Sequence, residues 1–191
     1  NLICAFLPAA VIGLLLEDLI EVKLGDNINA VAGALIIGAL VMFLVERWRK
    51  KGREVIVKSV KRPNLHSLTL RQALMIGLFQ CIAMWPGTSR SMATIVGGYI
   101  AGLSPKHAAE FSFLLGLITL SAASGYKILK DGDQMINTLE IRPMLVGFLF
   151  AFVSAACAVK WFVNYLNKNG LVPFAWYRIG LAIAVFLLLG K

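Results

Sequence analysis

Long apolar runs separated by short polar segments dominate this chain. Five of these runs extend from Leu2 to Leu16, from Ile28 to Val45, from Ala108 to Leu129, from Met144 to about Leu166, and from Leu171 to Gly190. A helix needs roughly 17 to 25 residues to cross the hydrocarbon core of a membrane. The last three runs meet this length and the first two come close to it. The pattern therefore predicts an all-α polytopic membrane protein with about five transmembrane helices.

A sixth apolar region, 68–103, is interrupted in its middle by the polar stretch 85-WPGTSRSMAT-94. The arm that follows the interruption, from Ser89 to Leu103, is too short to cross a membrane. Pro86 cannot continue a helix, and Gly87 permits an irregular turn. Irregular backbone at membrane depth is tolerated only where protein or a water-filled cavity covers it. We therefore predict a re-entrant helical hairpin, which dips into the membrane and returns to the same side.

The charges of the polar segments predict the orientation of the chain in the membrane. Segment 46–63 carries eight lysines and arginines against two glutamates, whereas segment 17–26 is net acidic. Because positive loops stay in the cytoplasm, 46–63 places both ends of the hairpin on the cytoplasmic side. Segments 17–26 and 130–143 then fall outside, while Lys160 and Lys168 lie at the cytoplasmic face. All these segments agree with one topology.

Composition supports the membrane class and limits the partners. Hydrophobic residues make up 59% of the chain and charged residues 15%, whereas a soluble domain is about half apolar and a quarter charged. The net charge of +9 comes from residues gathered in short segments between apolar runs, which is typical of cytoplasmic loops and argues against a nucleic-acid partner. Cys4, Cys81 and Cys157 lie in apolar runs without CxxC spacing, which predicts buried free thiols. The chain starts inside an apolar stretch without Met, so we expect a fragment of a longer protein.

The interruption in the hairpin gathers groups that bind anions. Thr88 or Ser89 is a natural N-cap for the second half-helix, with Arg90 and Ser91 in or beside its first turn. The first amides of a helix lack partners, and the N-terminus carries about half a positive charge. Amides, hydroxyls and a guanidinium thus converge, and phosphate fits this geometry. Thr94, four residues after Arg90, would add a hydroxyl to the same ligand. An arginine at membrane depth is itself a functional hypothesis.

Structural interpretations of the same residues stay open. Arg90 would be explained without a ligand if it paired with Glu110 or capped another helix. Ser89 is better suited to hydrogen bonding than to nucleophilic attack, because no His or Asp lies near it in sequence. Gln80, ten residues before Arg90, would face a cavity or bond to backbone. Arg178, next to Tyr177, is expected to anchor in the lipid headgroups.

One small-residue motif is expected to serve packing. Gly98 and Gly102 form a GxxxG pattern, which favours close approach of helices.

The segment 79-FQCIAMWPGTSRSMATIVGGYIAGLSPKHAAEFSFLL-115 resembles the second signature of bacterial undecaprenyl-diphosphate phosphatases of the bacitracin-resistance type. Their PGxSRSxxT pattern is met in full by Pro86, Gly87, Ser89, Arg90, Ser91 and Thr94. The flanking stretches 71-RQALMIGLFQC-81 and 173-PFAWYR-178 are similar to that family too, so the resemblance covers essentially the whole chain.

The resemblance implies a fold and an activity. Family members are inverted repeats, each half a re-entrant hairpin followed by three transmembrane helices. Residues 1–63 would hold the last two helices of the first repeat and the basic loop, and 64–191 the second repeat, with its hairpin at 68–103. The family hydrolyses undecaprenyl diphosphate to undecaprenyl phosphate and phosphate, recycling the lipid carrier for peptidoglycan and cell-wall synthesis. Its site opens to the periplasmic face of the bacterial inner membrane.

The resemblance also assigns site residues and partners. Arg90 would bind the diphosphate, Ser89 would contact it and Thr94 would support it. From the residues around the break themselves, Pro86, Gly87, Thr88, Ser91 and Gln80 are expected as further substrate-binding positions. A divalent cation, Mg²⁺ or Ca²⁺, is expected as cofactor. The expected partners are the polyprenyl diphosphate substrate, membrane lipids and, as one option, a second copy of the chain in a homodimer.

The sequence departs from the family in one respect. The family's first signature, a glutamate-rich motif followed by a Ser and a His, is not found, and the Glu17-Asp18-Glu21 cluster does not match it. We therefore expect the ligands of the cation to lie mostly outside this chain, and the 191 residues alone to be inactive. A transporter or flippase of an anionic lipid is the alternative, because helices broken at the midplane are a transporter device. A structural membrane subunit is a third interpretation.

Overall fold

Residues 1–24, 28–56, 68–138 and 141–189 are described by a computed structural model, and every regular element within them is an α-helix. In chain order the helices are α1 (Leu2–Leu24), α2 (Ile28–Ile56), α3 (Leu70–Ile82), α4 (Arg90–Ile100), α5 (Pro105–Thr138), α6 (Ile141–Asn169) and α7 (Val172–Leu189). This confirms the predicted all-α class. Three stretches are long and apolar enough to cross a membrane, namely Ile28–Lys50, Pro105–Lys130 and Arg142–Asn169. The chain is therefore a membrane protein by length and composition.

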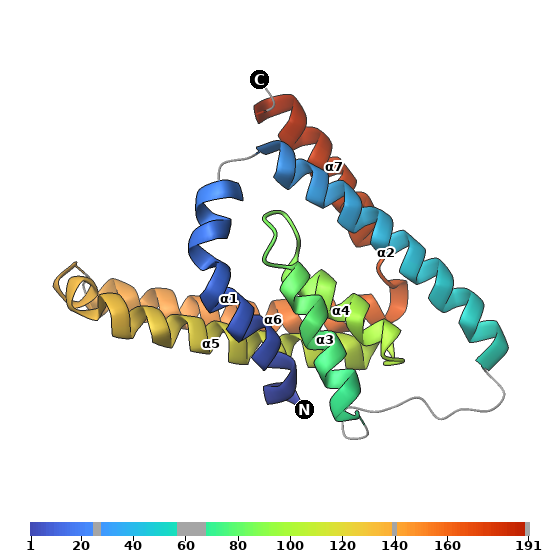
Figure 1. Cartoon of the computed structure of the whole chain (residues 1–191), viewed down its shortest axis with the longest axis horizontal. Coiled ribbons are helices and arrows are strands. Elements are labelled where there is room, and N and C mark those ends of the chain that lie inside the picture. The colour runs from blue at the N-terminus through green and yellow to red at the C-terminus, as the bar shows by residue number, and fades with distance from the viewer. Residues whose placement is uncertain (25–27, 57–67, 139–140, 190–191) are drawn as a thin grey trace.

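Two long helix pairs frame the molecule (Figure 1). Helices α2 and α7 run side by side in opposite directions, and α5 and α6 form the second antiparallel pair. The short helices α3 and α4 lie between these pairs, joined by a loop, and α1 packs beside α3. The hairpin formed by α3 and α4 is thus the element around which the other helices are arranged.

Helix α4 lies in the middle of the packed core. All eight residues from Met92 to Tyr99 are buried, as expected of a helix enclosed on all sides. Ile76 of α3, Ile95 of α4 and Leu115 of α5 are among the most deeply buried side chains. By contrast, the exposed apolar residues of α6, such as Phe150, have no protein cover within the described residues and suit contact with lipid. The core therefore holds α4 in place, while the outer face of α6 is apolar and open.

Glycines allow the central helices to approach closely. A Cβ atom on Gly77 of α3 would overlap the backbone of Ala5 in α1, so the two helices meet backbone to backbone. A Cβ on Gly98 would lie 2.8 Å from the Cβ of Ala108 in α5, which confirms the predicted packing role of Gly98. Gly102 has another role, because it ends α4 with φ of +89°. The N–H of the next residue, Leu103, donates back to the Gly98 carbonyl at 2.9 Å.

Several polar segments predicted as loops are helical instead. Helix α1 continues to Leu24, α2 continues from Val45 to Ile56, and α5 continues to Thr138. The prediction was wrong there because hydropathy marks the edge of the membrane, whereas charged residues such as Lys, Arg and Glu are good helix formers and do not end a helix. The rest of the predicted basic loop, 57–67, lies outside the described residues.

Candidate anion site at the hairpin tip

The helix break at Pro86-Gly87 lies where the sequence predicts it. After α3 ends at Ile82, a series of tight turns forms the tip loop, which we define as residues 83–89. Four backbone N–H groups there each donate to the carbonyl three residues earlier: those of Ala83, Met84, Trp85 and Thr88. Gly87 has φ of +83°, and a Cβ on it would lie 2.6 Å from the carbonyl oxygen of Val31 in α2. Glycine is needed here for its conformation and for this contact.

Helix α4 begins with hydroxyl groups at its N-terminus. Of the two predicted caps, Ser89 is the observed one: its backbone is extended, and its Oγ accepts from the N–H of Met92 at 3.3 Å. The hydroxyls of Ser89 and Ser91 lie 3.1 Å apart. Both side chains are half-buried. Two hydroxyls therefore flank the positive end of the helix.

Arg90 is the first residue of α4, and its guanidinium donates to the backbone carbonyl of Gly116 in α5 at 3.2 Å. A Cβ on Gly116 would lie 2.7 Å from a guanidinium nitrogen, so the glycine makes room for the arginine. Glu110, the predicted alternative partner of Arg90, instead lies 3.8 Å from Lys106 in a partly exposed pair. Among the described residues, the acceptor given for Arg90 is a neutral carbonyl. A guanidinium has five N–H groups, so this contact leaves capacity for an anion.

Thr94 is enclosed behind Arg90, with 2% of its surface exposed. Its hydroxyl lies 2.7 Å from the hydroxyl of Ser112 in α5, 3.0 Å from the Arg90 carbonyl and 3.2 Å from the Ser91 carbonyl. The side chain thus joins the first turn of α4 to α5. This placement fits the predicted supporting role, and direct contact of Thr94 with a ligand stays a prediction.

Gln80 reaches the same helix from α3. The side chain is 3% exposed, and its Nε2 donates to Thr119 Oγ1 at 3.2 Å. Thr119 in turn donates to the Leu115 carbonyl at 2.7 Å. Gln80 Oε1 is buried and has no partner among the described residues. Gln80 therefore bonds to a side chain rather than to backbone, and it lies in the interface between α3 and α5.

Three polar contacts between the hairpin and α5 form a single row. Ser112, Gly116 and Thr119 are spaced by four and three residues, which places them on one face of α5. The Ser112 hydroxyl bonds to the Thr94 hydroxyl, the Gly116 carbonyl accepts from Arg90, and the Thr119 hydroxyl accepts from Gln80. Ser112 and Thr119 were not predicted as site residues, although the spacing of small and hydroxyl residues in an apolar helix is a signal that the sequence contains.

Arg178 is a buried arginine near the tip, and its predicted place in the headgroups is wrong. The side chain is only 6% exposed. Its Nη2 donates to the Gly87 carbonyl at 2.9 Å and to the Ala34 carbonyl at 3.2 Å. Tyr177, its neighbour in α7, is exposed. Adjacent residues of a helix point in different directions, so one faces outward and the other faces the core.

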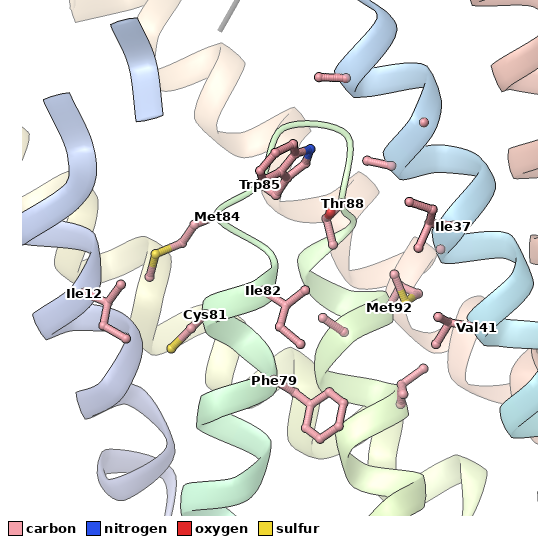
Figure 2. Close-up of a pocket in the computed structure, with 16 residues that line it drawn as sticks. Ile12, Ile37, Val41, Phe79, Cys81, Ile82, Met84, Trp85, Thr88 and Met92 are labelled. Atoms are coloured by element: carbon pink, nitrogen blue, oxygen red, sulfur yellow. The ribbon is translucent and has the colours of Figure 1, made fainter. Parts of the chain in front are cut away.

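An apolar cavity of about 770 Å³ adjoins the tip loop (Figure 2). Its walls come from α1, α2, α3, α4 and the loop itself. Ile12 borders it on one side and Ile37 and Val41 on the other, while Trp85 and Thr88 border it at the tip. Thr88 is one of the few polar residues in the lining, and it directly precedes the Ser89 cap. An apolar cavity thus begins where the polar helix N-terminus ends.

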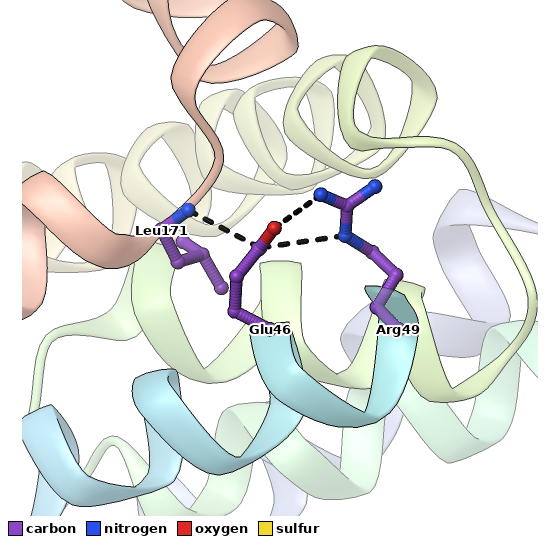
Figure 3. A network of polar contacts seen from close by, with 3 residues as sticks. All are labelled: Glu46, Arg49 and Leu171. Atoms are coloured by element: carbon purple, nitrogen blue, oxygen red, sulfur yellow. Dashed lines mark hydrogen bonds and ion pairs between the residues drawn. The ribbon is translucent and has the colours of Figure 1, made fainter. Parts of the chain in front are cut away.

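A second polar cluster joins α2, α4 and the start of α7 (Figure 3). Glu46 is 1% exposed, forms an ion pair with Arg49, and accepts from the Leu171 N–H at 3.3 Å. The Arg49 guanidinium lies over the Tyr99 ring, 5.5 Å from its centre. Glu46 was predicted to lie in the basic loop because of the charged residues that follow it, and its buried partner Leu171 is 125 positions away in sequence.

Metal-binding and thiol groups are sparse in the part of the chain that the structure describes. No three His, Cys, Asp or Glu side chains gather there in a way that would hold a metal ion, so the cation stays a prediction. The cysteines are free, but Cys157 is exposed and Cys4 and Cys81 are only partly buried. The prediction of burial was wrong for Cys157, because α6 packs mainly against α5 and leaves its outer face open.

The whole chain is similar to one group of known proteins. Residues 1–184 match the profile of a family described as bacitracin resistance protein BacA. An undecaprenyl-diphosphatase of Clostridium tetani is 40% identical over 189 residues, which cover 98% of this chain and 66% of the relative. Relatives of the same name from Sorangium cellulosum and Aquifex aeolicus are 42% and 40% identical, over 95% and 98% of this chain and 57% and 71% of their own lengths.

Proposed function

Because this chain belongs to the bacitracin resistance protein BacA family, we propose that it is part of a membrane phosphatase that hydrolyses undecaprenyl diphosphate to undecaprenyl phosphate and phosphate. The chain spans about two thirds of the length of the Clostridium tetani relative, so the activity is proposed for the full-length protein. The product would return to cell-wall synthesis as a lipid carrier, and faster recycling would underlie bacitracin resistance.

One observation carries this proposal: a cationic helix N-terminus adjoins an apolar cavity. Ser89, Arg90 and Ser91 present hydroxyls and a guanidinium, and Thr88 links them to the cavity. A substrate that fills both parts must have an anionic end and a long apolar body. A polyprenyl diphosphate has this form, whereas a soluble phosphate ester lacks the apolar part.

In the proposed reaction, water supplies the oxygen that bonds to the terminal phosphorus, and the bond from that phosphorus to the bridging oxygen breaks. Arg90 and the free amides of α4 would stabilise the charge that develops on the phosphoryl oxygens and on the leaving lipid phosphate. Thr94 would hold Arg90 in place through Ser112. A divalent cation, when bound, would neutralise charge on the diphosphate. The described residues do not assign its ligands or the group that activates the water.

We also propose that α3 and α4 form a re-entrant hairpin and that the other five helices cross the membrane. Helices of 13 and 11 residues are about 20 and 17 Å long, too short for a hydrocarbon core of about 30 Å. The basic residues near the end of α2 and Lys168 near the end of α6 support a cytoplasmic position for those ends. This orientation directs the tip towards the periplasmic side of the inner membrane.

A phosphate-release assay on the full-length protein with undecaprenyl diphosphate in detergent micelles tests the function. We expect turnover in the wild type and a loss of at least about a hundredfold in Arg90→Ala, the size expected for loss of a group that stabilises the transition state. An Arg71→Ala variant, which changes an exposed arginine of α3, is the matched control. In vesicles that contain the full-length protein, transfer of labelled lipid between leaflets without phosphate release would instead support the flippase. The 191-residue segment alone is expected to be inactive.

A further inference from the structure

Two arginines, the half-buried Arg90 and the buried Arg178, hold the tip loop. Arg90 anchors its end to α5, whereas Arg178 reaches it from α7 through the Gly87 carbonyl. The same Nη2 atom of Arg178 also donates to Ala34, and Nε points at the Leu35 carbonyl at 3.4 Å. One guanidinium therefore bridges three backbone segments: α7, α2 and the tip loop.

A glycine in α2, Gly38, leaves the space that the Arg178 guanidinium occupies. A Cβ on Gly38 would lie 2.7 Å from Arg178 Nη2, so a larger residue would displace the guanidinium. The backbone of Gly87 rests on Val31, one turn before Ala34, as described above. The acceptors of Arg178 are three backbone carbonyls, two reached from Nη2 and one from Nε, and the single nitrogen of a lysine does not offer donors at two separate positions.

Nothing in this arrangement places Arg178 against a ligand. Its Nε and Nη2 donate to backbone carbonyls, and its side chain does not line the apolar cavity. Gly87, however, lies three residues before Arg90 and two before the Ser89 cap. A displacement of Gly87 would therefore move the N-terminus of α4 with respect to α2 and α7.

We propose that Arg178 is a positioning residue: it ties the tip loop to the α2–α7 pair and thereby fixes the anion-binding end of α4. The effect on turnover rests on the proposed function, whereas the effect on the loop does not. Loss of the tie would lower kcat roughly tenfold to a hundredfold, because small displacements of reacting groups are costly. KM would change little, because Arg90 and the cavity remain.

The test compares Arg178→Met with Phe43→Ala in the full-length protein. Phe43 packs edge-on against Trp176 at 5.4 Å, so its loss weakens the same α2–α7 pair away from the tip. Hydrogen exchange of peptides covering 83–89 is the first readout and kcat against KM the second. We expect exchange at the tip to become about tenfold faster in Arg178→Met and to stay unchanged in Phe43→Ala. Arg178→Lys should be intermediate, because it keeps the charge without the fork.

A second pair of variants covers the case in which Arg178→Met does not fold. Gly38→Ala should displace the guanidinium, whereas Gly180→Ala, an exposed position of α7 two residues after Arg178, meets open space and lies outside the cavity wall. Only Gly38→Ala should accelerate exchange at the tip and lower kcat.

Unchanged exchange at the tip in both Arg178→Met and Gly38→Ala would overturn the proposal. So would a loosened tip with an unchanged kcat, or equal effects of Phe43→Ala. If the wild type released no phosphate while the exchange contrast held, the proposed function would fail and the tie would stand.

Discussion

Thr94 and Ser112 join α4 to α5 through a 2.7 Å hydrogen bond between two buried hydroxyls. The bond lies one turn from Arg90, whose own carbonyl is also within reach of Thr94. The Thr94–Ser112 pair therefore holds the backbone of Arg90 against α5.

Replacing Thr94 by Val should lower the free energy of unfolding by about 1–3 kcal/mol, because the buried Ser112 hydroxyl loses its partner. Thr94→Ser keeps the hydroxyl and should cost less. The measurement is thermal unfolding in detergent. The double variant Thr94→Val/Ser112→Ala is the control: removing both hydroxyls should cost less than the sum of the single changes. Strict additivity would show that the two residues are not coupled.

Gly116→Ala should weaken the site through Arg90. The added methyl would lie 2.7 Å from the guanidinium and push it off the Gly116 carbonyl. Phosphate release by the full-length protein should fall about tenfold, which corresponds to roughly 1.4 kcal/mol of transition-state stabilisation. Gly125→Ala, on the same helix but in open space, should change the rate less than twofold. Equal rates in the two variants would contradict the observed position of Arg90.

The sequence predicts the helix break well because its causes are local. Pro86 ends a helix, Gly87 adopts a positive φ, and Ser89 caps the next helix. Each effect depends on residues close in sequence, so these three residues predict the tip loop. The start of α4 at Arg90 follows from the same signals. Local chemistry therefore predicts which groups the hairpin presents at its tip.

The partners of those groups are not local. Arg90 meets Gly116, and Arg178 meets Gly87, 91 positions away in sequence. Hydropathy assigns both arginines to membrane segments but does not say which helix each one faces. For Arg178, proximity to the aromatic residues Trp176 and Tyr177 suggested the headgroups, whereas tertiary packing turned it inward.

Glu46→Leu should destabilise the end opposite the tip. It leaves Arg49 and the Leu171 N–H without their buried acceptor, and loss of one partner of a buried ion pair costs about 3–5 kcal/mol. Glu46→Gln, which keeps an acceptor, should lose less. Glu110→Gln in the more exposed pair with Lys106 is the comparison and should cost at most about 1 kcal/mol. Unfolding temperatures in detergent would rank the three variants, with Glu46→Leu the lowest. Equal decreases for Glu46→Leu and Glu110→Gln would contradict the prediction.

Gly170→Ala should be destabilising for two reasons. Gly170 has φ of +70°, and its added Cβ would lie 2.6 Å from a carboxylate oxygen of Glu46. Conformational strain alone costs about 1 kcal/mol or more. Gly147→Ala, within α6 and in open space, should instead be neutral or stabilising, since alanine favours a helix. A higher melting temperature in Gly170→Ala than in the wild type would contradict both the conformational strain and the contact with Glu46.

The cap of α4 implies an exchange of partners. The Ser89 hydroxyl already accepts from the Met92 amide, which is one of the groups a bound phosphate would seek. An anion that takes over this amide becomes the cap of the helix itself, and frees Ser89 to donate to the anion. Occupancy of the site would then be visible in the backbone as well as in the ligand, as a change in the amide resonance of Met92 on titration with pyrophosphate.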